Sequence, residues 1–226
     1  MRFLTLFYFA GSLLLTAWPA AAIYLNTTVY SVEARDAFLS IPVVNNTSVA
    51  NIYSVQAFKI DKPGVGGENR VRENEKDVIW SPLNITIPPG GKDYFKVFYR
   101  GPKDRQERYF RIIFRELPVT IVPFKKNARA TEVVSTISMS AILIVRPRTT
   151  VLKYAYDESQ GILKNSGNTF FRVIIHKGCA GDDESSHQFH MLPGERYSSA
   201  TLKGMNRKFI VAEGRYIPLG TACFGI

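Results

Sequence analysis

The chain has 226 residues, of which 46% are apolar and 21% are charged, with 29 Lys and Arg against 19 Asp and Glu. This composition excludes wholesale disorder and low-complexity chains, and the length allows one large domain or two small ones. Two cysteines are too few for a disulfide-framework mini-protein or a structural zinc cage. The net charge of +10 invites a nucleic-acid partner, so the compartment has to be settled first.

The first 22 residues predict a cleaved signal peptide. Arg2 precedes an apolar run over residues 3–18, and Ala20 and Ala22 form a small-residue processing site. The alternative, a membrane anchor, is disfavoured because glycine, serine and threonine interrupt a run that is already short. We therefore expect an exported chain without stable membrane insertion. Export excludes a nucleic-acid partner and leaves an acidic partner, an anionic membrane surface or simple solubility to explain the charge.

After residue 22, short segments rich in Val, Ile, Tyr, Phe and Thr alternate with turn signals, which predicts an all-β fold. The expected strands of the first part are residues 24–32, 37–44, 52–60, 83–87, 94–99, 109–115 and 133–145. Polar loops are expected over residues 64–76 and 123–131. Seven strands before residue 146 match the count of an immunoglobulin-like sandwich.

The expected strand 109–115 has two unlike faces. Its even positions are Phe110, Ile112 and Phe114, whereas Arg111 and Arg115 occupy odd positions. Because successive side chains of a strand point to opposite faces, the even row is predicted to face the core and the odd row to present cations.

The expected strand before Pro147 is unusually long, since most strands have five or six residues. Its odd positions carry a nearly continuous apolar row: Val133, Ser135, Ile137, Met139, Ala141, Leu143 and Val145. A strand of this length either links two domains or projects past its sheet. In the second case its apolar side chains would be exposed unless another segment or chain packs against them.

A second, smaller unit follows. Its expected strands are residues 151–156, 161–164, 169–176, 188–192 and 208–211. A core of this size is marginal alone. Cys179 and Cys223 both lie in it and predict a disulfide, worth about 3–4 kcal/mol by loop entropy, with free thiols as the alternative. We expect a signal peptide over 1–22, a first domain over 23–147 and a second domain over 148–226.

The residues give no sign of catalysis. The chain lacks a Gly-x-Ser-x-Gly elbow, a phosphate-binding loop and a dinucleotide-binding glycine motif. His187 and His190 are three residues apart in a strand-like context, so their rings would point to opposite faces. We therefore expect no enzyme, no metal site and no cofactor.

The segment 87–118, IPPGGKDYFKVFYRGPKDRQERYFRIIFRELP, resembles the N-terminal core of periplasmic pilus chaperones. The long strand that ends at Arg146 and Pro147 is similar to the interdomain strand of that family, and residues 163–169 resemble the start of its second domain. The tracts YFKVFYRGPKDRQERYFR and ILKNSGNT are most similar to the enterobacterial common-pilus, or alternative chaperone–usher, branch.

The resemblance implies two immunoglobulin-like sandwiches in a boomerang with a cleft between them. It implies a periplasmic chaperone that lends an edge strand to an incomplete pilin subunit, prevents premature polymerisation and delivers the subunit to an outer-membrane usher. By the same analogy the donor residues are Val133, Ile137, Met139 and Ala141.

One part of the family pattern is missing. Known members hold the C-terminal carboxylate of the subunit with an Arg on the first strand and a Lys near the interdomain strand. The matching positions here are Thr28 or Val29 and Ile142, which carry no cation. Because a charge-assisted contact to a carboxylate needs Arg or Lys, Arg111 is predicted as a substitute. The alternative is that Arg111 pairs with a nearby acid.

Glu107 and Arg146 match the structural ion pair that the family has at the domain junction. Two other function classes stay open at this stage. A pilus subunit or adhesin could share the sandwich fold, and an exported glycan-binding or membrane-binding module could use the cations and tyrosines.

Overall fold

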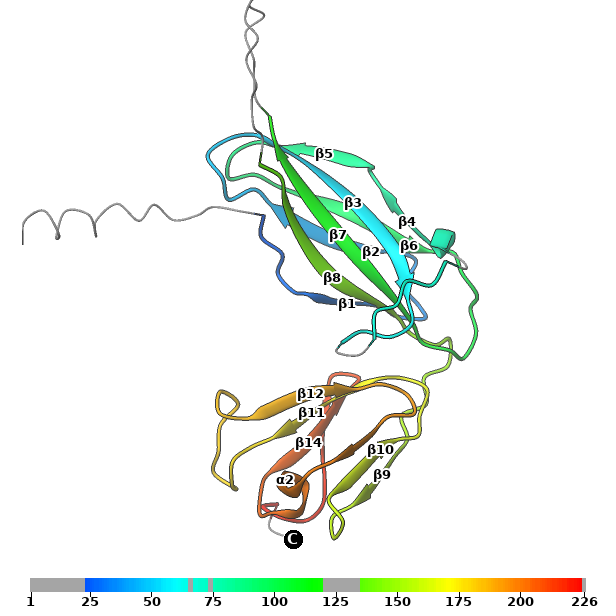
Figure 1. Ribbon diagram of the computed structural model, residues 1–226, viewed down its shortest axis with the longest axis vertical. Helices are drawn as coiled ribbons and strands as arrows, with labels where there is room; N and C mark the ends of the chain where they lie inside the picture. Colours follow the sequence, from blue (N-terminus) through cyan, green and yellow to red (C-terminus); the bar gives the residue numbers. More distant parts are fainter. Residues whose placement is uncertain (1–22, 65–66, 73–74, 120–134, 225–226) are drawn as a thin grey trace, which may run out of the picture.

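The structure is a computed structural model that describes residues 23–64, 67–72, 75–119 and 135–224. The expected signal peptide, the expected loop over residues 123–131 and Val133 lie outside the described residues. The described chain forms two β-sandwich domains, one above the other in Figure 1, with their strands in blue to green and in yellow-green to red.

The first domain contains eight described strands and one short 3-10 helix. They are β1 (Val29–Val32), β2 (Leu39–Val44), β3 (Asn51–Ile60), η1 (Glu75–Asp77), β4 (Val78–Ser81), β5 (Asn84–Ile87), β6 (Lys92–Tyr99), β7 (Arg108–Pro118) and β8 (Ile137–Val145). One sheet has the order β1-β8-β7-β3-β5 and the other has the order β2-β6-β4. Side chains from both sheets meet in one apolar core.

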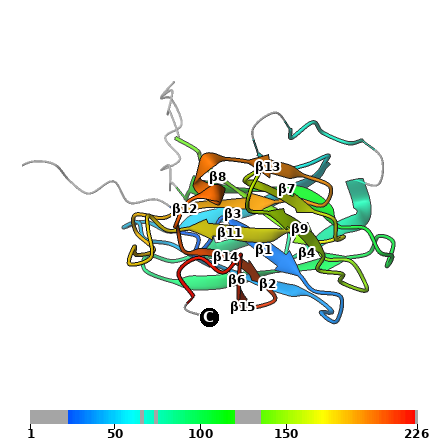
Figure 2. The ribbon, with the colours of Figure 1, turned by 90° about the horizontal axis from the view of Figure 1, so that it is seen from below.

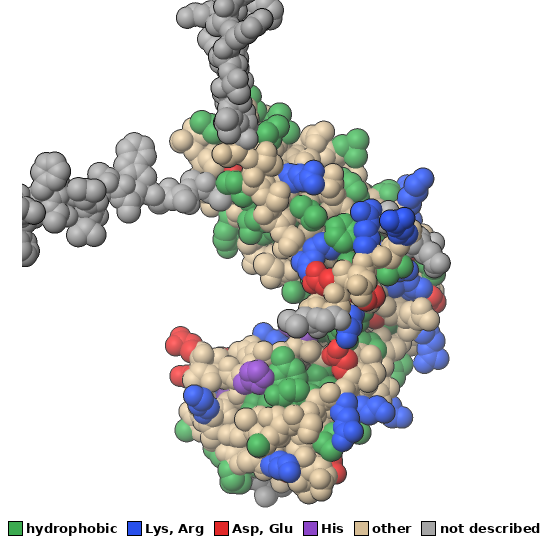
Figure 3. All heavy atoms as spheres, in the orientation of Figure 1, with side chains coloured by type: hydrophobic (Ala, Val, Ile, Leu, Met, Phe, Trp, Pro, Cys, Tyr) green, Lys and Arg blue, Asp and Glu red, His purple; other side chains and the backbone are tan. Residues whose placement is uncertain are grey.

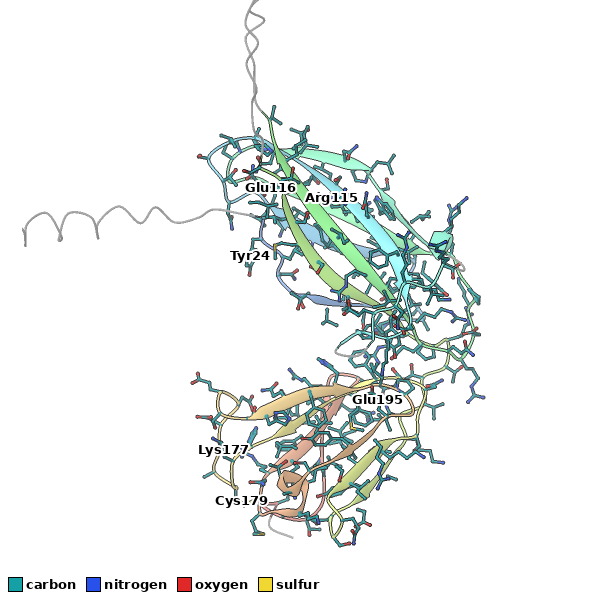
Figure 4. All side chains as sticks on the ribbon, in the orientation of Figure 1. Tyr24, Arg115, Glu116, Lys177, Cys179 and Glu195 are labelled. Carbon is teal, nitrogen blue, oxygen red and sulfur yellow. A yellow bond between two sulfur atoms is a disulfide. The ribbon has the colours of Figure 1, made fainter. Side chains whose placement is uncertain are left out.

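The alternation predicted for β7 is confirmed. Phe110, Ile112 and Phe114 are fully buried in the core, and Arg115 is exposed on the opposite face. Glu116 continues the core-facing row, so the neighbours Arg115 and Glu116 project to different sides of the sheet (Figure 4). The buried Glu116 carboxylate accepts a hydrogen bond of 2.8 Å from the hydroxyl of Tyr53, which partly satisfies it.

The described part of the second domain contains seven strands and one short helix. They are β9 (Tyr154–Asp157), β10 (Ile162–Asn165), β11 (Phe171–Ile175), β12 (His187–Met191), β13 (Arg196–Ser198), α2 (Ala200–Lys203), β14 (Lys208–Ala212) and β15 (Arg215–Pro218). The strands β12, β11, β14 and β15 form one sheet, visible from below in Figure 2, and β13, β10 and β9 form the other. The predicted disulfide between Cys179 and Cys223 is present.

A buried lysine connects three parts of the second domain. The Lys208 side chain is fully buried, and its ammonium donates to Glu158 Oε1 at 2.9 Å and to the carbonyl oxygens of Leu202 and Gly204 at 3.1 and 3.0 Å. A buried charge is tolerated when it is paired and hydrogen-bonded, and here all three amine protons have acceptors. The contact fixes β14 against α2 and the turn after β9.

Several short elements differ from the sequence-based expectation. The sequence predicts seven strands in the first domain, whereas the structure adds β4 as an eighth, and β13, α2 and β15 were also not expected. The unexpected elements have only three or four residues each. Such segments are too short to show a period of their own and depend on the neighbouring strands for their pairing.

Candidate functional site: an open strand edge and the adjoining cleft

One edge of β8 is only partly covered. Its other side pairs with β7 along the whole strand, from Ile137 opposite Glu116 to Val145 opposite Arg108. On the outer side, β1 pairs in parallel with β8 only from Ile142 to Val145. Within the described part of the chain, the stretch 137–141 has no strand on that side. This stretch is named the open edge, and it lies along β8 above β1 in Figure 1.

The backbone groups of the open edge can be assigned a direction. Ile142 donates its N–H to Thr28 O, and Arg146 donates to Val32 O, so even-numbered residues of β8 turn their N–H groups outward. Because the direction alternates along a strand, Ser138 and Ser140 also present their N–H and C=O groups to the open side. The open edge therefore carries a ready row of backbone donors and acceptors.

The odd-numbered side chains of β8 share the core-facing side of the sheet but differ in burial. Ile137 is 37% exposed, and Met139 is half-buried against the edge of the core. Ala141 is fully buried inside the core of its own domain. Because Ala141 is already enclosed by the core of the first sandwich, its side chain is not free to enter a partner in this structure.

Arg111 lies on the other face of β7, opposite Ile142 of β8. Its guanidinium forms an ion pair with Glu68, which lies in the loop between β3 and η1, and also donates to Ser140 Oγ at 3.3 Å. The hydrogen bond from Arg111 lowers the pKa of the Glu68 carboxyl. The alternative that the sequence left open, pairing of Arg111 with an acid, is the arrangement found.

The two domains are joined through Glu107, whose side chain is 1% exposed. Its carboxylate accepts hydrogen bonds from the backbone N–H of Phe170 at 3.1 Å, from Thr169 Oγ1 at 2.7 Å and from the Tyr109 hydroxyl at 2.7 Å. Arg146 Nη1 lies 3.5 Å from the same carboxylate, so the expected ion pair is present. The Arg146 guanidinium also stacks on the Phe170 ring at 3.9 Å, which brings both domains into one contact.

A pocket of about 350 Å³ lies between the domains next to the end of the open edge. Its apolar lining includes Val29 and Ile142 from the first domain and Phe170 and Leu192 from the second. The space-filling view shows the molecule hollowed between the two domains (Figure 3), and Glu195, another lining residue, lies on the second domain where it approaches the first (Figure 4).

Acidic pH is expected to weaken folding through His190, which packs edge-on against Phe170 in this pocket with ring centroids 5.5 Å apart. Partial burial, with Arg172 and Arg146 nearby, lowers the pKa of His190. Glu195 is the acidic group that lines the same pocket. Protonated His190 is therefore less favourable in the folded protein than in the unfolded chain. The contribution of neutral His190 to stability is full above the ordinary histidine pKa of about 6.5, and it is lost as the pH falls below that value.

Urea unfolding at about pH 7 and about pH 5 checks this expectation. A His190→Gln variant should lose less stability than the natural protein between the two conditions. Equal losses in both proteins would contradict the assignment to His190.

The described residues contain no group of three or more His, Cys, Asp and Glu side chains placed to hold a metal ion. In the same residues, no helix is long and apolar enough to cross a membrane. The sequence missed two contributors to the site, Glu68 and Thr169. Glu68 belongs to a segment that the sequence predicts as a polar loop. Because that segment has no hydrophobic periodicity, the sequence gives no sign that Glu68 contacts Arg111, 43 residues away.

The sequence has relatives along nearly its whole length. It is 31% identical over 212 residues to the probable fimbrial chaperone EcpE of Escherichia coli O127:H6 (strain E2348/69 / EPEC), covering 93% of this chain and 89% of that protein. It is 32% identical over 213 residues to EcpE of E. coli K12, with the same coverage. The probable fimbrial chaperone EcpB of Klebsiella pneumoniae (strain 342) is 24% identical over 205 residues, covering 89% of this chain and 91% of that one. No family model matches the chain.

Solved structures share the fold. The crystal structure of the class 5 fimbriae chaperone CfaA has a TM-score of 0.54 at 12% identity, covering 88% of this chain and 98% of that chain. The E. coli chaperone DraB has a TM-score of 0.55 at 11% identity, with the same coverage. The relatives above 30% identity, which match almost all of both chains, show that the chain belongs to the fimbrial chaperone family.

Proposed function

We propose that this chaperone captures pilus subunits by adding its open edge to their unfinished sheet, and that it passes them to an outer-membrane usher. The single observation that carries the proposal is the open edge itself. Residues 137–141 combine outward backbone groups with two apolar side chains, those of Ile137 and Met139, that the first domain does not fully bury. A strand edge of this kind is the means by which β-augmentation joins two chains.

The side chains that would enter the subunit are Ile137 and Met139. Both retain exposed surface, and burial of that remaining surface in the core of a partner contributes part of the about 1.5–3 kcal/mol that complete burial of such a side chain is worth. The proposal extends to Val133 on the sequence pattern alone. Ala141 is not included, since its side chain is already buried in the core of the first domain. The capped subunit would be kept from polymerising because its own exposed edge is occupied.

The proposal places this activity in the periplasm, after export by the N-terminal segment. It requires no cofactor and no catalytic step, because strand addition forms only non-covalent contacts. The division of the chain into domains at residues 147 and 148 is part of the same proposal. Two separate cores support it, one formed by residues between 23 and 145 and the other by residues between 163 and 219.

Ser140→Pro is expected to lower capture of the pilin from the same operon by about tenfold or more. Proline removes the N–H that Ser140 turns outward and leaves the bonds to β7, which odd-numbered residues make. The preceding Met139 already has the extended backbone that a following proline requires. Co-purification from periplasmic extracts, followed by a titration with the purified subunit, measures the effect.

Ser140→Ala is the matched control. It removes the same hydroxyl, including its contact with Arg111, but keeps the backbone N–H. Capture should stay close to that of the natural protein. Full capture by a folded Ser140→Pro variant would contradict strand addition at this edge, and thermal unfolding shows whether the variant is folded.

A further inference from the structure

The linker between the two domains is held by a side chain of the second domain. This linker comprises residues 147–153, between the end of β8 and the start of β9. Asn168 lies in the turn between β10 and β11. Its Oδ1 accepts the backbone N–H of Val151 at 2.7 Å, and its Nδ2 donates to Thr149 O at 2.9 Å. The backbone N–H of Asn168 also donates to Val151 O at 3.1 Å, so the linker is held at two of its residues.

The same side-chain amide reaches the first domain. The Nδ2 of Asn168 also donates to Arg105 O at 3.0 Å, in the loop between β6 and β7. Both amide protons and the amide oxygen therefore have partners. Next to this contact, the linker residue Arg148 donates its backbone N–H to Asp104 O at 2.7 Å in the same loop. The first domain, the linker and the second domain thus meet at Asn168.

The residue before Asn168 allows the turn to lie directly on the linker. A Cβ atom at Gly167 would collide with Val151 O and would lie 2.8 Å from Lys153 N, and both are backbone atoms of the linker. Ser166 donates its backbone N–H to Lys153 O at 2.9 Å. A side chain at position 167 would therefore push the linker away from the turn. Residues 166–168 are named the linker clamp.

The structure leaves room for the domains to move if the linker is released. A cavity of about 500 Å³ borders the linker clamp, with Gly167 and Asn168 on one side and Gln106 and Glu107 on the other. Hinge motions between domains are absorbed by a few residues of the connecting segment. In this chain the connecting segment is the linker, and Asn168 holds its backbone.

We infer that Asn168 is a positioning residue that fixes the orientation of the two domains for subunit capture. The inference rests on the proposed function and adds to it the residue that sets this orientation. Because the open edge ends beside the cleft, a subunit on that edge also faces the second domain. If the orientation were free, only the correctly oriented fraction of molecules would bind, and the apparent affinity would fall by that fraction.

Asn168→Asp tests the inference, because it keeps the acceptor for the Val151 N–H and removes the donors to Thr149 O and Arg105 O. Capture of the pilin from the same operon should fall about fivefold, as for a correctly oriented fraction of about one fifth. Small-angle X-ray scattering of the purified protein should show a broader distribution of distances. Gly167→Ala should have both effects, since it displaces the linker. Amide exchange in β11 and β14 should stay unchanged in a folded variant.

Asn206→Asp is the matched control. Its amide donates to Thr201 O and accepts from the backbone N–H of Gly178, so both partners belong to the second domain. Capture and scattering should stay those of the natural protein.

Three results would overturn the inference. The first is unchanged scattering in both Asn168→Asp and Gly167→Ala. The second is weaker capture by Asn168→Asp with unchanged scattering, which would make Asn168 a contact residue for the subunit. The third is normal capture despite broader scattering. Any of these, with capture lost in Ser140→Pro, would leave strand addition standing. Normal capture by a folded Ser140→Pro variant would remove the proposed function, whereas scattering would still report on the linker clamp.

Discussion

Replacing Glu107 with alanine is expected to lower the free energy of unfolding by roughly 3–5 kcal/mol, because it removes one partner of a buried ion pair. The Glu107 carboxylate is 1% exposed, and the Arg146 side chain beside it is 14% exposed. Without the carboxylate, the Arg146 charge and the N–H of Phe170 lose an acceptor in a site that water reaches poorly. Urea unfolding of Glu107→Ala and of the natural protein measures the difference.

Asp104→Ala provides the control for a carboxylate that pairs with arginine at the surface. Asp104 forms a bidentate ion pair with Arg108, with a shortest distance of 2.6 Å, but its side chain is 43% exposed, so its loss should destabilise the protein less than the loss of Glu107. Similar losses for Glu107→Ala and Asp104→Ala would show that the junction carboxylate contributes no more than a surface pair. Because the junction also fixes the pocket between the domains, Glu107→Ala should in addition lower capture of the subunit.

Removing the disulfide by Cys179→Ser with Cys223→Ser is expected to destabilise the second domain by roughly 4 kcal/mol. The two cysteines are 44 residues apart, and the loop-entropy relation gives about this value for such an interval. The second domain depends on this disulfide more than a domain with the larger core of the first would. Among the described residues, the second core has nine buried apolar residues and the first has nineteen, so the second has less apolar burial to offset the lost constraint.

Two probes separate the domains in this experiment. Trp80 of β4 packs against the first core, so its fluorescence follows the first domain. Amide exchange in β11 and β14 follows the second domain. We expect faster exchange in β11 and β14 with little change in the Trp80 transition. Unchanged exchange after loss of the disulfide would show that the second core is sufficient alone.

Much of the fold could be predicted from local pattern. The alternation in β7 assigns Phe110, Ile112 and Phe114 to the core, and the structure buries all three. In a chain that the sequence predicts to be exported, two cysteines are expected to pair with each other because there is no third cysteine, and they form a disulfide in the structure. Local pattern did not reveal that Lys208 is buried, because its acceptors come from Glu158, 50 residues away, and from carbonyl groups of other segments.

In the candidate site, too, some features could be predicted from local sequence pattern and others could not. The odd-numbered apolar row of β8 was visible in the sequence, because a strand repeats every two residues. The sequence could not tell which part of the row is free. Ile137 is partly exposed and Ala141 is buried, although both occupy the same face of one strand. Ala141 belongs to the apolar core that side chains of both sheets form, whereas Ile137 lies outside it, and most of that core comes from segments distant in the chain.

By itself, the sequence determined that this is a basic, all-β chain with two sandwich units and one disulfide, and it predicted an apolar row along the strand before Pro147, which the structure describes as the nine residues of β8. These properties follow from residue type and local period. Only the tertiary structure decided where the edge of β8 is open, that Glu68 engages Arg111, and that an apolar pocket lies beside the end of the edge. Each of these depends on which distant segments become neighbours, and a period of two specifies a face of the strand without specifying what packs beside it.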